Sequence, residues 1–133
     1  MSVPINDNYC FACGQDNPFG LKLEFSMDNG KYTAAKILPK EFQGYNGIAH
    51  GGILTTMLDE AMAGYLNKEL GEYAVTARLD VRYRRPAPIG EMLTITAWEE
   101  SRKGNFVNMK AAVTLPDGSV ATEASGKMAI LTE

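Results

Sequence analysis

One stretch of the sequence carries a helical pattern, and this stretch limits the fold more than any other feature. Apolar residues recur there at the i, i+3, i+4 spacing of a single helical stripe, at positions 54, 57, 58, 61, 62 and 65. The pattern extends to about Leu70, and Gly71 stands where a helix stop is expected. We find no second pattern of this length, so the sequence predicts one long helix.

Most of the remaining sequence alternates between apolar and polar residues, which is the period of a half-buried β-strand. Six such runs are predicted, over residues 21–26, 32–38, 76–83, 93–98, 107–115 and 120–131. Turn sequences rich in Asp, Asn and Gly join neighbouring runs at 28–30 and 116–118. The order β-β-α-β-β-β-β predicts an α+β fold, with an antiparallel sheet of about six strands wrapped around or stacked on the helix.

The chain is long enough for one hydrophobic core and too short for two. It has 133 residues, of which 45% are hydrophobic and 22% charged, as in an ordinary globular protein. We expect a single domain over residues 1–133, whose first 20 residues form an irregular N-terminal cap. One helix covers only one face of such a sheet, so a partner subunit is expected to bury the other face or an edge.

Charge and hydropathy exclude several classes of protein. Thirteen Lys and Arg against sixteen Asp and Glu give a net charge of −3, which argues against nucleic-acid binding. No apolar run is long enough to span a bilayer, and residues 1–7 lack the basic and apolar parts of a signal peptide. We therefore expect a cytoplasmic protein that does not bind membranes and keeps its two cysteines reduced.

His50-Gly51-Gly52 stands at the start of the predicted helix. Glycine lets a ligand approach the backbone, and the unpaired N–H groups of a first helical turn can stabilise a carbonyl oxygen that gains negative charge. The alternative is that the two glycines only allow a tight entry into the helix. His50 is the only histidine of the chain, so sites that need several histidines are excluded.

Two carboxylates, Asp59 and Glu60, lie in the same helix. At about 100° per residue, Asp59 falls beside Met62 on the margin of the apolar stripe, where a carboxylate loses hydration water and suits a general base. A surface acid at the edge of solvent is the competing interpretation. Glu60 falls on the other side, beside Gly64, and is interpreted as such a surface acid.

Two further groups of residues leave alternatives open. Four of the five arginines lie between positions 78 and 85, which is compatible either with phosphate binding or with structural ion pairs to Asp80 or to glutamates across the sheet. Cys10 and Cys13 have the spacing of half a zinc knuckle, but the sequence contains no second Cys-x-x-Cys pair. A packing or turn-forming role is therefore favoured for the cysteines over a metal or redox role, and no cofactor or metal is expected.

These segments together resemble a known family. Residues 50–61, which run from His50-Gly51-Gly52 to Asp59, resemble the signature of hotdog-fold acyl-CoA thioesterases of the phenylacetate-degradation (PaaI-like) type. The loop at 42–48 and the strand at 75–86, with its Tyr-x-Arg-Pro turn, are similar to segments of the same family, and residues 10–21 look like a cap segment of related members. The resemblance covers most of residues 10–130.

The resemblance implies an active site at the interface of a homodimer, with dimers commonly pairing into a homotetramer. The Gly51 N–H would polarise the thioester carbonyl, and Asp59 of the other subunit would act as general base or as nucleophile. Thr76 would position the attacking water or the carboxylate, and His50 would shape the loop near the thioester. Some relatives carry an amide side chain at the position of Gly44, and the nearby Asn46 is the residue that could replace it.

The function implied is hydrolysis of an acyl-CoA thioester to a carboxylic acid and free CoA. Gly52 and Asn46 are predicted to contact the substrate, and the side chains predicted to contact the CoA phosphates are Arg84, Arg85, Arg102 and Lys103. Two alternatives remain, a hotdog module that binds acyl-CoA without hydrolysing it, and an acyl-thioester hydratase or dehydratase.

Overall fold

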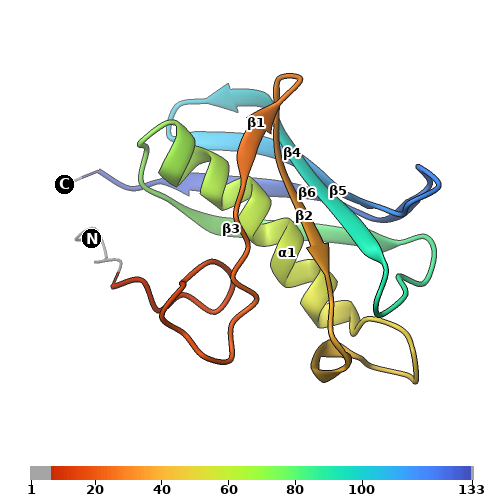
Figure 1. The fold of residues 1–133 in the computed structure, drawn as a ribbon. Coiled ribbons are helices and arrows are strands. Elements are labelled where there is room, and N and C mark those ends of the chain that lie inside the picture. Colours follow the sequence, from red (N-terminus) through yellow and green to blue (C-terminus); the bar gives the residue numbers. More distant parts are fainter. Residues whose placement is uncertain (1–6, 133) are drawn as a thin grey trace.

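The structure, a computed structural model, describes residues 7–132. Residues 1–6 and Glu133 lie outside the described residues. The start of the predicted cap therefore cannot be compared with the structure, and neither can residues 1–6 of the segment predicted not to be a signal peptide. Within residues 7–132, six strands form one antiparallel sheet in the order β1-β2-β4-β5-β6-β3, and one long helix, α1, packs against it (Figure 1). The predicted architecture is confirmed.

The elements follow the predicted order along the chain. The strands are β1 (Ser26–Asp28), β2 (Lys31–Ile37), β3 (Ala74–Tyr83), β4 (Met92–Lys103), β5 (Phe106–Thr114) and β6 (Val120–Ile130). The helix α1 spans Gly51–Gly64, and a π-helical turn, η2, continues it over Tyr65–Glu69. A short 3-10 turn, η1 (Lys40–Phe42), lies in the loop that precedes α1. No helix in residues 7–132 has the length and apolar character needed to cross a bilayer.

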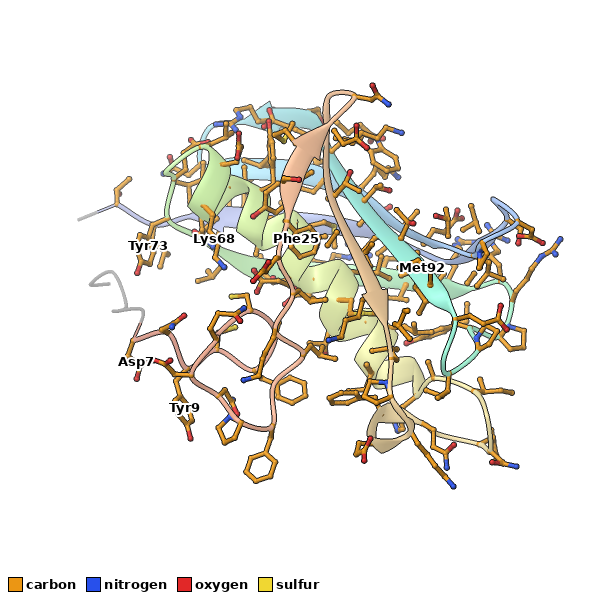
Figure 2. The ribbon with its side chains drawn as sticks, viewed as in Figure 1. Asp7, Tyr9, Phe25, Lys68, Tyr73 and Met92 are labelled. Carbon is orange, nitrogen blue, oxygen red and sulfur yellow. The ribbon has the colours of Figure 1, made fainter. Side chains whose placement is uncertain are left out.

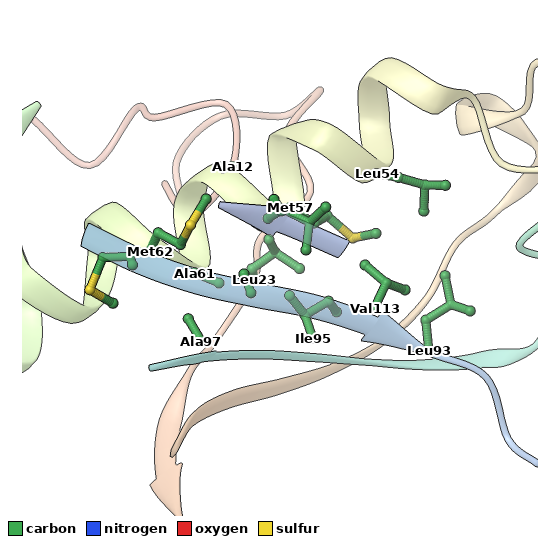
Figure 3. Packing of buried hydrophobic residues seen from close by; sticks show 14 of the residues in the cluster. Ala12, Leu23, Leu54, Met57, Ala61, Met62, Leu93, Ile95, Ala97 and Val113 are labelled. Carbon is green, nitrogen blue, oxygen red and sulfur yellow. The ribbon is translucent and has the colours of Figure 1, made fainter. Parts of the chain in front are cut away.

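The predicted apolar stripe of α1 forms the centre of the core. Leu54, Met57, Leu58, Ala61 and Met62 are all buried, and Figure 3 shows residues of this stripe facing buried side chains of the sheet. Because each large apolar side chain buried in this way contributes about 1.5–3 kcal/mol, this packing fixes which face of α1 turns away from solvent. Gly71, with φ +69°, ends the helical segment in the left-handed conformation that glycine favours.

The first predicted strand differs from the structure. Residues 21–25 are not part of the sheet, and β1 begins only at Ser26. The alternation correctly indicated burial, since Leu21 and Leu23 are buried, but their backbone amides bond to the carbonyls of Phe11 and Ala12 in the N-terminal segment. Lys22, with φ +53°, also interrupts the extended conformation that a strand needs.

Strand β3 forms one edge of the sheet and carries the irregularity that matters for the site. It has ten residues, pairs on one side only, and has nine residues in register with β6. The register with β6 shifts between Thr76 and Arg78, so Ala77 is the extra residue of a β-bulge. Such bulges re-aim the side chains beside them, and Thr76 is one of these.

Candidate active site

The first turn of α1 presents one backbone amide without an acceptor. His50 caps the helix in an extended conformation, and its Nδ1 accepts a hydrogen bond of 2.9 Å from the Gly52 amide. The His50 carbonyl accepts from the amides of Ile53 and Leu54. Among the residues that the structure describes, the Gly51 N–H is left without an acceptor, at the end of α1 where the helix dipole is positive. This amide can therefore stabilise a negative oxygen.

Tyr83, at the end of β3, holds this turn in place. Its hydroxyl donates to the Gly51 carbonyl at 2.9 Å and therefore accepts the 2.5 Å hydrogen bond from the Thr55 hydroxyl. A Cβ atom at Gly51 would lie 3.3 Å from the Tyr83 ring, so glycine suits the close approach of strand and helix. Nothing in the sequence pattern predicts this contact, although Tyr83 lies in the Tyr-x-Arg-Pro turn.

Two turns farther along α1, the structure joins two of the predicted site residues. The Thr76 hydroxyl donates a 2.5 Å hydrogen bond to Oδ1 of Asp59. Asp59 is half-buried and Thr76 is exposed, which leaves the carboxylate accessible from one side. Since Oδ2 has no hydrogen-bond partner within residues 7–132, it remains available to accept a proton from a water molecule.

The amide and the carboxylate cannot act on the same carbonyl group within one chain. Gly51 and Asp59 are eight residues apart on α1, which at 1.5 Å per residue is about 12 Å. Catalytic contacts need distances of about 3 Å. A site that uses both groups therefore needs a second copy of the chain.

Two hollows flank the N-terminus of α1. One, of about 390 Å³, is lined by Glu41, Phe42, Gln43, His50, Gly52, Ile53 and Thr56. The other, of about 370 Å³, is lined by Gly44, Tyr45, Ile48, Ala49, His50 and Gly51. His50 lines both, and Asn46 is exposed next to Tyr45, which lines the second. The structure thus brings His50, Gly51, Gly52 and Asn46 to one end of the helix.

The four basic residues predicted to contact CoA phosphates differ in their surroundings. Arg84 pairs with Glu123 at 2.7 Å, as the ion-pair interpretation anticipated. Arg102 pairs with both Glu72 and Glu99, at 2.8 and 2.7 Å. Arg85 and Lys103 are exposed, and neither forms an ion pair within the described part of the chain.

Glu60 is not the surface acid that its place on the helix predicts. It is half-buried, its Oε1 lies 3.8 Å from the Cys10 sulfur, and a Cβ atom at Gly64 would meet its Oε2 at 2.7 Å. Burial raises the pKa of Glu60 above its usual value, and it raises the pKa of Cys13 to about 11. The difference arises because the N-terminal cap covers this side of the helix, which the periodicity of the helix alone does not reveal.

Comparison with known proteins supports the family assignment. A model of the thioesterase superfamily matches residues 46–122. An uncharacterised protein of Schizosaccharomyces pombe is 42% identical over 84 residues, which are 59% of this chain and 48% of that protein. Acyl-coenzyme A thioesterase THEM4 of Bos taurus is 27% identical over 85 residues, 63% of this chain and 34% of that protein. The chain thus matches about half and about a third of the length of these two relatives.

Solved structures show the same fold. A thioesterase superfamily protein with 27% sequence identity superimposes with a TM-score of 0.82 over 90% of this chain and 62% of its own. The PaaI protein of E. coli has 22% identity and a TM-score of 0.76, over 84% of this chain and 81% of its own. A hypothetical thioesterase from Streptococcus pneumoniae TIGR4, solved with coenzyme A, has 23% identity and a TM-score of 0.75, over 84% of this chain and 87% of its own. As the resemblance of residues 50–61 predicted, the chain belongs to the thioesterase superfamily and has its hotdog fold.

Proposed function

We propose that the protein hydrolyses acyl-CoA thioesters to a carboxylic acid and free CoA, in a site shared by two copies of the chain. The observation that carries this proposal is the Gly51 amide, the one first-turn N–H of α1 without an acceptor in residues 7–132. The oxygen of a thioester carbonyl bound there gains negative charge in the transition state. The fixed N–H donor and the positive end of the helix would stabilise that charge.

Asp59 supplies the second half of the proposed chemistry. With Oδ1 held by the Thr76 hydroxyl, Oδ2 takes a proton from water as the water attacks the carbonyl carbon, or attacks that carbon itself. The tetrahedral intermediate then expels the CoA thiolate, which takes the proton from the Asp59 carboxyl and leaves as the thiol. Where Asp59 itself attacks, expulsion of the thiolate leaves a mixed anhydride, and a water molecule then hydrolyses it to the carboxylic acid, regenerates the carboxylate and supplies the proton that the thiolate takes. Thr76 acts by orienting the carboxylate, because its hydrogen bond fixes the plane of the Asp59 side chain.

The edge strand β3 is the proposed dimer contact. It is long and has exposed apolar side chains, including Val75 and Tyr83, so it offers both backbone groups and apolar area to a second copy. Tyr83 touches Gly51 at one end of β3, and Thr76 touches Asp59 at the other end. In an antiparallel pair of β3 strands centred between these residues, each Thr76 end lies beside the partner's Tyr83 end. Such a pair therefore brings Asp59 of one chain toward Gly51 of its partner.

The substrate class rests on the relatives and on the charges around the site. One relative is named an acyl-coenzyme A thioesterase, and one structure with the same fold was solved with coenzyme A. Of the predicted phosphate contacts, Arg85 and Lys103 form no ion pair with any residue between 7 and 132, and we propose that they bind the CoA phosphates. Arg84 and Arg102 would have to exchange their glutamate partners to do so.

The proposal is tested by thiol release from a panel of aryl, short-chain and long-chain acyl-CoAs. The change Asp59→Asn keeps the shape and removes the base, and it is expected to lower kcat by at least about a hundredfold. Glu91→Gln, an exposed acid in a turn, is the matched control and is expected to keep full activity. Tight acyl-CoA binding without thiol release by the wild-type protein would contradict hydrolysis and indicate a binding module.

The shared site has its own test. Co-refolding of Asp59→Asn chains with Gly51→Pro chains gives mixed dimers in which one site has both intact groups and the other has neither. Random pairing should therefore restore about a quarter of the wild-type activity, whereas a site within one chain would restore none. Gel filtration of the wild-type protein separates a dimer from the expected tetramer.

A further inference from the structure

The N-terminal segment folds back over one flank of α1. The amides of Leu21 and Leu23 bond to the carbonyls of Phe11 and Ala12 at 2.8 and 2.9 Å, and Ala12, Leu21 and Leu23 are buried. Figure 1 shows this segment as loops beside the helix. These contacts place the turn at residues 10–13 against the side of α1 that carries Glu60.

Three side chains that favour metal ions converge at this contact. One potential ligand atom from each of Cys10, Cys13 and Glu60 lies within 4.8 Å of the other two, and the Cys10 sulfur lies 3.8 Å from Glu60 Oε1. In a tetrahedral zinc site, Zn–S bonds of about 2.3 Å and Zn–O bonds of about 2.0–2.2 Å hold the ligand atoms about 3.5–3.8 Å apart. The set therefore matches a zinc site after shifts of about 1 Å or less.

We propose that Cys10, Cys13 and Glu60 form a zinc-binding site, with a water molecule in the fourth position. The thiolates and the carboxylate are ligands that zinc takes in proteins, and the Cys-x-x-Cys spacing is typical of a zinc-binding turn. The site joins the N-terminal segment to α1 across 50 residues of sequence.

The backbone of the turn is suited to this role. The Gly14 amide closes the turn by bonding to the Cys10 carbonyl at 2.8 Å. A Cβ atom at Gly14 would lie 2.3 Å from the Cys10 nitrogen, a distance at which the backbone would have to move. The turn that brings the two sulfurs to one side of the chain therefore requires glycine directly after Cys13.

The surrounding charge also fits a divalent cation. Two thiolates and one carboxylate carry three negative charges, so zinc leaves the cluster with a net charge of −1. The positive charge of Lys68 acts to lower the pKa of both Cys13 and Glu60, and it brings the sum to zero. In Figure 2, Lys68 lies beside the helix on the side that faces the N-terminal segment. A lysine in this position serves as an outer partner of a coordinated thiolate.

The proposed zinc site is separate from the proposed active site. Glu60 follows Asp59 directly and therefore projects about 100° away from it around α1. Asp59 faces β3 through Thr76, whereas Glu60 faces the N-terminal segment through Cys10. A zinc ion bound there would join the N-terminal segment to α1 and would take no part in the proposed hydrolysis.

The test is metal analysis of the full chain, without an affinity tag and in the presence of a phosphine reductant. We expect about one zinc per chain, and cobalt(II) in place of zinc should give the thiolate-to-cobalt absorption of a sulfur-ligated ion. Loss of a residue that only supports a ligand typically weakens metal binding by about tenfold to hundredfold. Cys13 and Glu60 are proposed as direct ligands, so Cys13→Ser and Glu60→Gln should each weaken zinc binding by more than this. The control Glu91→Gln should bind zinc as the wild type does.

The proposal is overturned if the wild-type chain, supplied with zinc, holds none after removal of loosely bound metal and shows no thiolate-to-cobalt band. It is also overturned if Glu60→Gln binds zinc with unchanged affinity, because the carboxylate would then not be a ligand. A variant that fails to fold leaves the wild-type zinc and cobalt measurements to decide. These readouts do not depend on thioester hydrolysis, so either proposal can fail while the other stands.

Discussion

The Gly51 amide can be removed from the protein with almost no other change. In Gly51→Pro, the proline stands at the first helical position, where a missing N–H breaks no bond within the helix. His50, the residue before it, already has φ −62° and ψ 133°, the extended conformation that a following proline requires. Gly51→Ala is the matched control, since it adds a comparable Cβ, 3.3 Å from the Tyr83 ring, and keeps the N–H.

The expected loss follows from the role proposed for this single donor. Removing one oxyanion donor typically lowers kcat by about 10²–10³, which corresponds to about 2.7–4 kcal/mol of transition-state stabilisation. We therefore expect Gly51→Pro to fall below Gly51→Ala by this factor in kcat for thiol release from the best acyl-CoA. Thermal unfolding of both variants checks that the helix entry is intact, because both introduce a Cβ beside Tyr83. Equal kcat values for two folded variants would refute the assignment of this amide.

Two further predictions concern hydrogen bonds to carboxylates. Thr76→Val removes the donor to Asp59 Oδ1 and is expected to lower kcat by about 10- to 100-fold, the effect of losing a hydrogen bond to a charged group. Thr76→Ser keeps the hydroxyl and should retain most activity. Equal losses in kcat for the two variants would contradict the positioning role. Arg102 lowers the pKa of Glu72, so this pair stabilises the fold above the ordinary carboxyl pKa and loses its effect as pH falls through the lowered pKa. The melting temperature of Arg102→Met should therefore lie below that of the wild type near pH 7 and approach it near pH 3, and a pH-independent difference would contradict the ion pair.

The elements that the sequence predicted correctly are those determined locally. Leu54, Met57 and Leu58 belong to a stripe whose spacing puts apolar side chains on one face only if the segment is a helix. Gly71 ends the helical segment because glycine adopts the left-handed conformation readily. The alternation at 21–25 indicated burial correctly but not pairing, because Leu21 and Leu23 donate their backbone bonds to the N-terminal segment instead. Periodicity reports which side of a segment is buried and does not report what lies against it.

In the candidate site, too, local sequence patterns predict some residues, whereas contacts between distant residues are not predicted. Asp59, Gly51 and Thr76 are predicted because residues 50–61 and 75–86 resemble segments of a family. The structure joins Thr76 to Asp59 by a hydrogen bond, and the catalytic roles of the three residues stay predictions. Tyr83 was missed because its contact with Gly51 spans 32 residues of sequence. Glu60 was misjudged for the same reason, since its neighbour Cys10 is 50 residues away and sequence spacing alone does not relate them.

The two edge strands of the sheet differ in length, and this difference limits assembly by strand pairing between chains. At one edge β1 has three residues, whereas β3 at the other has ten. A contact between two β3 strands is symmetric and occupies the long edge of both chains, so what remains outside is a pair of edges too short to recruit another chain. In the proposed dimer, growth by strand addition would then stop at two subunits, and the short β1 edges would keep such dimers from extending into fibrils.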